Sequence, residues 1–559
     1  MKTYCKMLAA IVLSIATVSS VFAKEYDLVI NNGRVMDPET KYDKVANVGI
    51  TGGKIAVITE KKISGKETID ASGLVVAPGF IDTHFHAVDP FATKLVVADG
   101  VTTGMDLEAG SAPVGGWYAQ KDASGWQVNY GTTSGMIANR LFVHDPEVEI
   151  TGPMDAGVGS GYLDKAALDG TAGWSVTRSS IDQMNQIMSL IDEDLRQGAI
   201  GLGVGAAYMA QGLTSYEQFL GQKVAANYGR LSSVHTRFHL STETPTEAPI
   251  GLSEVLANAM ALNAPLLLAH DNDYGWWENE EKLRLVREQG YNVWAEYYPY
   301  EAGSTFISAD FLRPELWEAV QGYKYEETVY DPGQDKFLTK DEYLQMVKEK
   351  PGYLVVVFLL KRKEWMKHWL TIPHMTVASD AMPGVDAKGN FLPWDADVSK
   401  YAGHPRTAGS FSKTLQLARD ANVPLMFTLS QLSYWPAKHL GDTGLKSMQQ
   451  RGRVQEGMVA DLTLFDPVTV ETRATYKVGE NGLPPVGIPY VIVNGTVVVD
   501  GGEVLDVRPG QPIRFPVEEK GRFEPISPGG WLNENTISDQ IVPHMDDSGA
   551  GQMVGGHKN

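Results

Sequence analysis

The chain has 559 residues, 43% of them hydrophobic and 21% charged, which predicts a globular protein with one large domain and smaller satellites. Its 68 acidic residues outnumber the 48 basic ones, and the formal net charge of −20 argues against nucleic acid as a partner. Cys5 is the single cysteine, so a metal site in the folded chain must use histidine and carboxylate ligands.

The first 23 residues have the pattern of a bacterial secretory signal peptide. Lys2 and Lys6 precede an apolar stretch, which ends in a candidate cleavage site at Val21-Phe22-Ala23. We therefore predict a signal peptide at 1–23 and a periplasmic or secreted protein, with an uncleaved N-terminal anchor as the alternative. No later run approaches the roughly 20 apolar residues of a membrane span, so no span is expected after cleavage.

Two β-rich segments flank a long central region. Near the N-terminus, Asn31-Asn32-Gly33 and Thr51-Gly52-Gly53 stand between short apolar runs and predict hairpin turns, as Asn494-Gly495 does near the other end. We expect both chain ends to build one small β-sandwich domain. Its predicted parts are residues 24–78 and 451–516, followed by a C-terminal extension at 517–559.

The central region alternates helical and strand patterns. Amphipathic helices are predicted at 182–198, 214–229, 253–263 and 279–290, and apolar strands at 198–205, 231–238, 264–273 and 291–300. This order predicts parallel strands with crossover helices, hence a (β/α) barrel or an open α/β sheet. We assign residues 79–450 to this domain and expect 305–369, which breaks the alternation, to be an inserted subdomain.

Polar side chains stand at the ends of predicted strands, where a (β/α) barrel carries its chemistry. His84 and His86 follow the apolar run 74–82, and residues two apart on a strand face the same side. Further polar residues at strand ends are Asp106, Glu108, His235, His270 and Asp380. Each alone is more typical of a structural residue or a helix cap, but together they form a zinc-type ligand set, with His239 as an alternative ligand.

The motifs VVAPGFIDTHFH, DGVTTG and RGRVQEGMVADLTLFDP resemble the amidohydrolase superfamily. The segments GAIGLGVG, VHTR, EYYPYEAGST, VASDAMP and HPRTAGSF resemble its D-aminoacylase and N-acyl-D-amino-acid (D-glutamate) deacylase branch, and the resemblance spans about residues 26–514. It implies a (β/α)8 TIM-type barrel with a flanking β-sandwich, and it implies that His84 and His86 are metal ligands of the first strand.

The resemblance also implies the rest of the metal centre. His235 and His270 match the histidines of a second metal position, and Asp380 matches an aspartate that is both a ligand and the catalytic acid–base residue. The branch's bridging cysteine is absent, and GAIGLGVG has no lysine that could bridge instead, so Glu108 is the expected bridge. The expected cofactor is one or two Zn²⁺ ions, with another divalent metal left open because Glu108 offers oxygen ligands.

Substrate recognition follows the branch in part. Arg406 matches an arginine that holds the substrate carboxylate, although a structural salt bridge is the other interpretation, and Tyr298 rather than Tyr300 is our choice for the matching tyrosine. The branch's lysine is absent, because Asn272 stands at its position. The spacing from Asp380 to Arg406 is also longer than in the branch, which weakens the match to a simple N-acyl-D-amino acid.

The resemblance implies a metal-dependent amidohydrolase that cleaves a linear amide in a small molecule. The reaction that we favour is deacylation of an N-acyl (D-)amino acid by attack of metal-bound hydroxide. A dipeptidase or a cyclic-amide or lactone hydrolase on the same scaffold is the alternative, and a non-catalytic binding protein is a more remote one. A homo-oligomer is left open.

Overall fold

The computed structural model describes residues 25–167, 172–238, 247–359 and 361–535. The predicted signal peptide and His239 lie outside these residues. Among the helices of the described ranges, none combines the length and the apolar character needed to cross a membrane.

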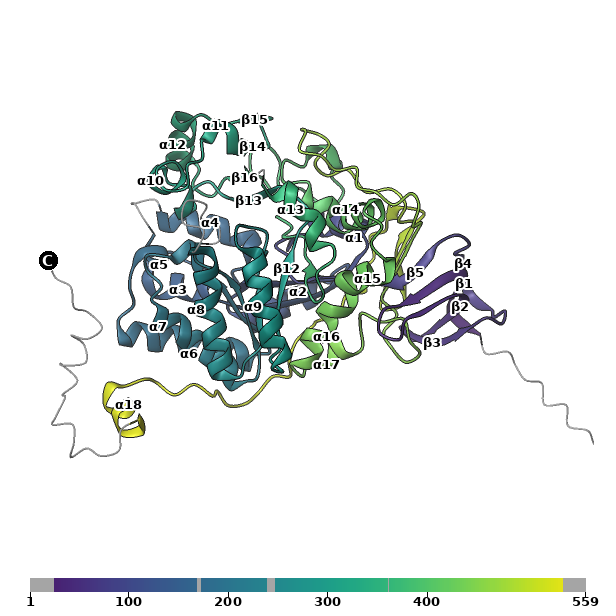
Figure 1. The fold of residues 1–559 in the computed structure, drawn as a ribbon, viewed down its shortest axis with the longest axis horizontal. Helices are drawn as coiled ribbons and strands as arrows, with labels where there is room; N and C mark the ends of the chain where they lie inside the picture. The colour runs from purple at the N-terminus through teal and green to yellow at the C-terminus, as the bar shows by residue number, and fades with distance from the viewer. Residues whose placement is uncertain (1–24, 168–171, 239–246, 360, 536–559) are drawn as a thin grey trace, which may run out of the picture.

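An eight-stranded parallel sheet forms the barrel at the centre of the molecule (Figure 1). In order around the sheet its strands are β6 (Phe80–Asp82), β7 (Val101–Ser111), β8 (Asn129–Gly135), β9 (Gly201–Gly205), β10 (Leu231–His235), β11 (Leu266–Leu268), β12 (Val293–Tyr297) and β17 (Thr376–Val377). The first and last strands meet where the Ser379 amide donates to Asp82 Oδ1 at 3.0 Å and Phe85 pairs with Ala381. The predicted (β/α)8 barrel is confirmed.

Helices cover the outside of the barrel because each buries one apolar face. The helix α6 (Ile181–Arg196) is an example: Met184, Ile187, Ile191 and Leu195 recur at helical spacing and are buried, and a capping box of Ser180 and Gln183 fixes its start. The other helices of the barrel domain are α1 (Pro90–Ala98), α2 (Val114–Ser124), α3 (Met136–His144), α4 (Ala156–Ala167), α5 (Gly173–Val176), α7 (Ser215–Asn227), α8 (Glu247–Leu262), α9 (Trp276–Glu288), α13 (Arg362–Trp369), α14 (Arg406–Asp420), α15 (Leu425–Leu429), α16 (Trp435–Asp442) and α17 (Lys446–Gln449).

The flanking β domain draws strands from both chain ends, as predicted, and lies beside the barrel (Figure 1). Its nine strands are β1 (Tyr26–Asp37), β2 (Tyr42–Thr51), β3 (Lys54–Thr59), β4 (Gly65–Asp70), β5 (Val75–Pro78), β18 (Leu462–Phe465), β19 (Tyr490–Val493), β20 (Thr496–Asp500) and β21 (Glu503–Val504). The two ends join where β5 pairs with β18, Ala77 opposite Thr463. Leu28 and Val48 from one end share a buried core with Leu462 and Ile492 from the other.

Two of the three predicted turns in this domain are confirmed. Gly52-Gly53 joins β2 to β3, and Asn494-Gly495 joins β19 to β20, each a two-residue loop with positive φ at both positions. The hairpin predicted at Asn31-Asn32-Gly33 is wrong. There β1 continues along β2 through a β-bulge, in which Asn32 takes φ 59° and its amide donates to the Asn47 side chain.

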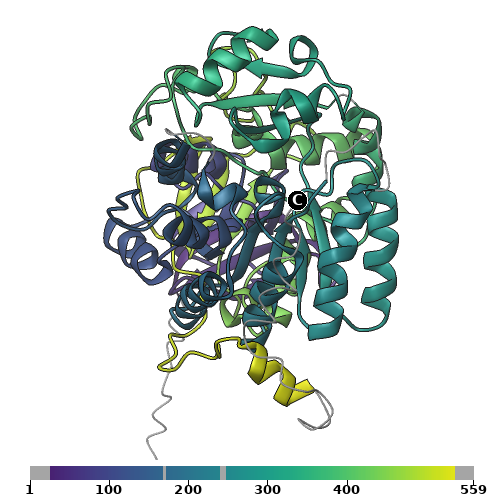
Figure 2. The ribbon, with the colours of Figure 1, turned by 90° about the vertical axis from the view of Figure 1, so that its left-hand side faces the viewer.

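A separate small sheet lies above the barrel, at the opposite end of the molecule from α18 (Pro528–Asn535), as Figure 2 shows. Its strands, in sheet order, are β13 (Ala302–Phe306), β16 (Leu354–Phe358), β14 (Val329–Asp331) and β15 (Lys336–Phe337), and its helices are α10 (Pro314–Trp317), α11 (Tyr325–Thr328) and α12 (Lys340–Glu349). Ile307, Trp317 and Val355 belong to its own buried core. This inserted subdomain begins at Ala302, three residues before the predicted start.

The segment that leads to α18 runs along the barrel wall. The amides of Arg522 and Phe523 donate to Asp192 on α6 at 2.8 and 2.9 Å, and Glu518 forms an ion pair with the buried Arg230. These contacts fasten the described part of the C-terminal extension to the outside of the barrel.

Candidate metal centre

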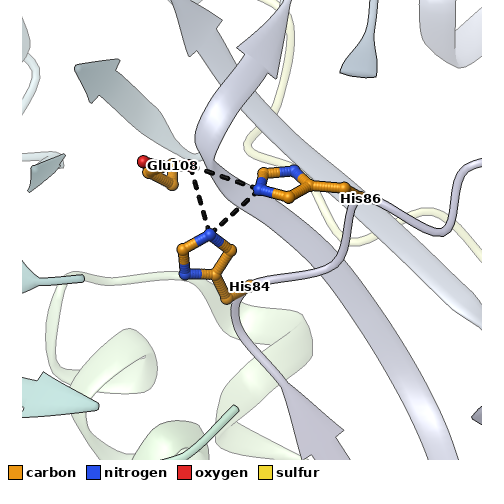
Figure 3. A group of neighbouring side chains, drawn as sticks. All are labelled: His84, His86 and Glu108. Carbon is orange, nitrogen blue, oxygen red and sulfur yellow. Dashed lines mark hydrogen bonds and ion pairs between the residues drawn. The ribbon is translucent and has the colours of Figure 1, made fainter. Parts of the chain in front are cut away.

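Two histidines just beyond β6 converge on one carboxylate oxygen (Figure 3). The Nε2 atoms of His84 and His86 are 3.0 Å apart, and they lie 3.1 and 3.2 Å from Oε2 of Glu108, which points inward from β7. All three side chains are buried. Two imidazole nitrogens held this close to each other and to a carboxylate form a group that a cation would stabilise.

A second pair of histidines lies on the other side of the same carboxylate. His235 ends β10 and His270 follows β11; Nδ1 of His235 is 3.0 Å from Nε2 of His270 and 2.7 Å from Oε1 of Glu108. Each oxygen of Glu108 therefore faces one pair of histidines. That is the arrangement a carboxylate needs to bridge two metal positions.

Asp380 completes the cluster from beyond β17. Its Oδ1 lies 3.5 Å from His84 Nε2 and 3.6 Å from His86 Nε2, and it forms a potential ligand group with His84 and His270. The structure thus brings together all six residues predicted as ligands. The donor set of imidazole nitrogens and carboxylate oxygens, without thiolate, fits one or two divalent ions such as zinc.

Two further acids orient the first histidine pair. Glu296 on β12 places Oε1 2.6 Å from His84 Nδ1, and Asp106 on β7 places Oδ2 3.0 Å from His86 Nδ1. A carboxylate on the outer nitrogen fixes the ring and leaves Nε2 free to bind a metal. From the sequence, Asp106 was predicted only as a polar residue at a strand end, not as a partner of His86. Glu296 was not predicted at all; its only sequence signal is that it is an acid within the buried strand VWAEY.

The charges of the cluster depend on one another. Burial opposes ionisation of Glu108, but the adjacent His84 and His235 outweigh it and hold the pKa of Glu108 well below its usual range. Burial also disfavours the charged form of His86, yet Asp106 and Glu108 together raise its pKa to about 10. The metal-free cluster therefore holds protons between its histidines and carboxylates at neutral pH, in the place where a metal ion would supply the positive charge.

Two of the predicted ligands have unusual backbone conformations. His270 takes φ 29° and Asp380 φ 49°, in the left-handed region that costs a non-glycine residue about 1–3 kcal/mol. The backbone next to His270 is held in place, since the Asp271 amide donates to the Glu296 carbonyl at 2.7 Å. Such conformations cluster at functional sites, because the surrounding fold holds side chains in positions that a relaxed strand end would not reach.

A cavity extends from the metal centre to the inserted subdomain, and one side of its wall carries Tyr298, Arg362 and Arg406. Arg406 is fully buried, and its Nη2 lies 2.7 Å from Asp380 Oδ1. The structure places Tyr298 on the cavity wall, whereas Tyr300 packs edge-on against His404 behind it. Of the two tyrosines weighed from the sequence, Tyr298 is the one that can reach a ligand.

Sequence reasoning missed Arg362, the third polar residue of this wall. It opens α13, at the exit from the inserted subdomain, and its Nε and Nη2 donate to the two Asp273 oxygens at 2.8 and 2.7 Å. Its remaining Nη1 donates to the Tyr298 hydroxyl at 2.5 Å. No local pattern could reveal it, because Asp273 and Tyr298 are 89 and 64 residues away in sequence.

The chain combines a (β/α)8 barrel that gathers histidines and acids at the ends of its strands with a β domain from both chain ends, the arrangement that the resemblance to the amidohydrolase superfamily implies. No family model matches the chain. It is 26% identical to N-acyl-D-glutamate deacylase of Alcaligenes xylosoxydans xylosoxydans over 88% of this chain and 97% of that protein. It is also 24% identical to D-aminoacylase of the same organism, over 85% and 95%.

A solved structure shares the fold across nearly the whole length. N-acyl-D-glutamate deacylase of Bordetella bronchiseptica, complexed with zinc and a phosphonate inhibitor, superposes with a TM-score of 0.68 at 22% identity, covering 88% of this chain and 100% of that one. Together with the two sequence relatives, it supports the resemblance to the D-aminoacylase branch of the amidohydrolases.

Proposed function

We propose that this protein is a metal-dependent hydrolase that removes the acyl group from N-acyl-D-amino acids. One observation carries the proposal: Glu108 lies between two histidine pairs, and the resulting ligand cluster opens into a cavity whose wall presents Arg406. The cluster fits the metal chemistry of amide hydrolysis, and the arginine fits the free carboxylate of an N-acyl amino acid. The activities named for the two sequence relatives support the same choice.

We propose zinc as the metal, supported by the nitrogen-rich ligand set and by the zinc complex of the Bordetella deacylase. His84, His86, His235 and His270 would hold it, with Glu108 as the bridge and Asp380 as a further ligand. When bound, a divalent zinc ion polarises an amide carbonyl and lowers the pKa of water to about 7. The signal-peptide pattern at 1–23 supports a periplasmic or secreted location.

Asp380 is positioned to move the protons of the reaction. Its carboxylate faces the cavity next to His84 and is held by Arg406 at 2.7 Å. We assign it to accept the proton of the attacking water and to deliver a proton to the departing nitrogen, because an amide anion is too basic to leave unprotonated. Glu296 and Asp106 keep the adjacent histidine rings in the orientation that this geometry requires.

Arg406 is proposed to hold the substrate carboxylate. Its Nη2 is occupied by Asp380, but its Nε and Nη1 are buried and have no hydrogen-bond partner among the described residues. A buried guanidinium donor without a partner is costly, and a carboxylate in the cavity would satisfy it.

The proposed function is tested with a substrate panel. The purified protein is supplied with zinc and assayed against N-acetyl-D- and N-acetyl-L-amino acids, dipeptides, a hydantoin and a lactone. Hydrolysis of the N-acetyl-D compounds above the others supports the proposal. Preferential hydrolysis of dipeptides or of the cyclic compounds would replace it with another activity of the same scaffold, and no hydrolysis of any compound would contradict it.

A further inference from the structure

We propose that Arg362, supplied by the end of the inserted subdomain, is a second binding residue for the substrate carboxylate and acts together with Arg406 and Tyr298. The inference rests on the proposed deacylase function and assigns a specificity role to a residue that the resemblance does not supply. It starts from the position of Asn272, where the resemblance implies a lysine.

Asn272 cannot supply the missing positive charge, and the structure shows what it does instead. Its side-chain amide donates to the Tyr298 carbonyl at 2.9 Å, and its side-chain oxygen accepts from the Tyr298 amide at 3.3 Å. Both partners are buried. Asn272 therefore fixes the backbone of the tyrosine that faces the cavity.

Arg362 lies beside Arg406 and Tyr298 on the wall of the cavity. Its Nη1, Nη1 of Arg406 and the Tyr298 hydroxyl surround the same point at Gly303 on β13. A β-carbon at Gly303 would be 3.1 Å from the hydroxyl, 3.7 Å from Nη1 of Arg362 and 3.8 Å from Nη1 of Arg406. The three donors therefore converge on the part of the cavity wall beside Gly303, and two guanidinium groups with a phenol suit a carboxylate.

Asp273 holds Arg362 in this orientation. The carboxylate takes Nε and Nη2 of the guanidinium in a bidentate pair, and both side chains are buried. The pair leaves Nη1 directed at Tyr298. Arg362 is therefore held in place before a ligand arrives, so little side-chain freedom is lost on binding.

The opposite interpretation is that the Arg362–Asp273 pair only fastens the inserted subdomain to the barrel. The two interpretations differ in their dependence on the charge of the ligand. A carboxylate-binding residue affects substrates that have a carboxylate, whereas a structural pair affects all substrates equally. The test therefore compares an N-acyl-D-amino acid with the same compound whose carboxylate is replaced by a primary carboxamide.

The variants are Arg362→Met, which removes the donors, and Arg362→Lys, which keeps the charge but not the fork. Arg451→Met is the matched control, because it breaks a buried arginine–aspartate pair with Asp461 that lies outside the cavity wall. For the carboxylate substrate, Arg362→Met is expected to raise KM about 10- to 100-fold, the usual effect of losing a hydrogen bond to a charged group. KM for the carboxamide is expected to change less than about 2-fold, and Arg362→Lys to lie between wild type and Arg362→Met.

If Arg362→Met does not fold, Arg362→Lys decides the matter, because it keeps the charge but loses the planar fork of donors that suits a carboxylate.

Equal losses on both substrates, or an unchanged KM for the carboxylate substrate in the variants that fold, would overturn the role of Arg362 and leave the deacylase proposal standing. If the zinc-supplied wild type hydrolyses neither compound, the proposed function fails and this inference fails with it.

Discussion

Oε1 of Glu108 lies 2.7 Å from Nδ1 of His235, while the other oxygen of the same carboxylate, Oε2, faces Nε2 of His84. This relationship suits Glu108 to the proposed bridging of two metal positions better than to binding a single metal ion. Glu108 stands on β7 two residues after Asp106, which orients His86.

The bridging role predicts a change in metal content. Wild type supplied with zinc should bind two equivalents, and Glu108→Gln should bind one or fewer, because a neutral amide is a poor ligand for two cations. Glu217→Gln is the matched control, since Glu217 is equally buried but pairs with Arg140. Metal analysis of the dialysed proteins checks this, and two equivalents retained in Glu108→Gln would rule out the bridge.

Removing the Asp380 carboxylate should lower kcat more than it weakens substrate binding. Asp380→Asn is expected to lower kcat by about 10²- to 10⁴-fold, the usual contribution of general acid–base catalysis. Steady-state kinetics with an N-acyl-D-amino acid, together with metal content, provide the measurement. Near-normal kcat in the variant would mean that another group transfers the proton.

Loss of the Glu296 carboxylate, which contacts His84, should weaken zinc binding more than it slows catalysis by the zinc-loaded protein. Glu296→Gln removes the charge 2.6 Å from His84 Nδ1 and is expected to weaken zinc binding about 10- to 100-fold. Excess zinc should then restore most of the activity. Competition with a chelator of known affinity measures the effect, and an unchanged zinc affinity would show that Glu296 has no part in the site.

The raised pKa of His86 predicts opposite pH trends for metal binding and for metal-free stability. Burial lowers this pKa, but Asp106 and Glu108 raise it from 6.5 to about 10, so the ring is protonated at neutral pH in the metal-free protein. Zinc must displace that proton, and zinc affinity should therefore increase as the pH rises from 7 toward 10. The stability that the protonated ring contributes is fully present below pH 6.5 and is lost as the pH rises through about 10.

Zinc titrations and thermal melts of the metal-free protein across this range check both trends. An affinity that falls with pH would contradict the first, and a metal-free melting temperature that increases between pH 8 and 10 would contradict the second.

The wall of the cavity predicts the preferred side chain of the substrate. Beyond the polar wall it is lined by apolar groups, among them Met154, Trp174, Phe311 and Leu359. An acidic side chain placed there would lose its hydration without gaining a partner. We expect kcat/KM for N-acetyl-D-leucine to exceed that for N-acetyl-D-glutamate at least about 10-fold, and a preference for the glutamate compound would contradict this account of the cavity.

Much of the fold and of the ligand cluster could be predicted from the sequence because the signals are local. His84 and His86 are two residues apart on one strand end, and the helix α6 has a regular apolar period and a capping box. The strand β8 was missed because NYGTTSG has no apolar run; it is buried through small and hydroxyl side chains instead.

The residues that could not be predicted depend on partners distant in the chain. Glu296 is 212 residues from His84 in sequence, and Arg362 is 89 residues from Asp273, with the inserted subdomain between them. The turn at Asn31-Asn32-Gly33 was misjudged for a related reason. A positive φ suits a bulge as well as a hairpin, and long-range pairing with β2 decided between them.

The most direct test of the central claim is the hydrolysis of an N-acetyl-D-amino acid by the same preparation before metal removal, after chelation and after zinc is restored. The account predicts that activity is present, is lost with the metal and returns with zinc. Activity that persists at full rate in the verified metal-free protein would contradict a metal-dependent deacylase.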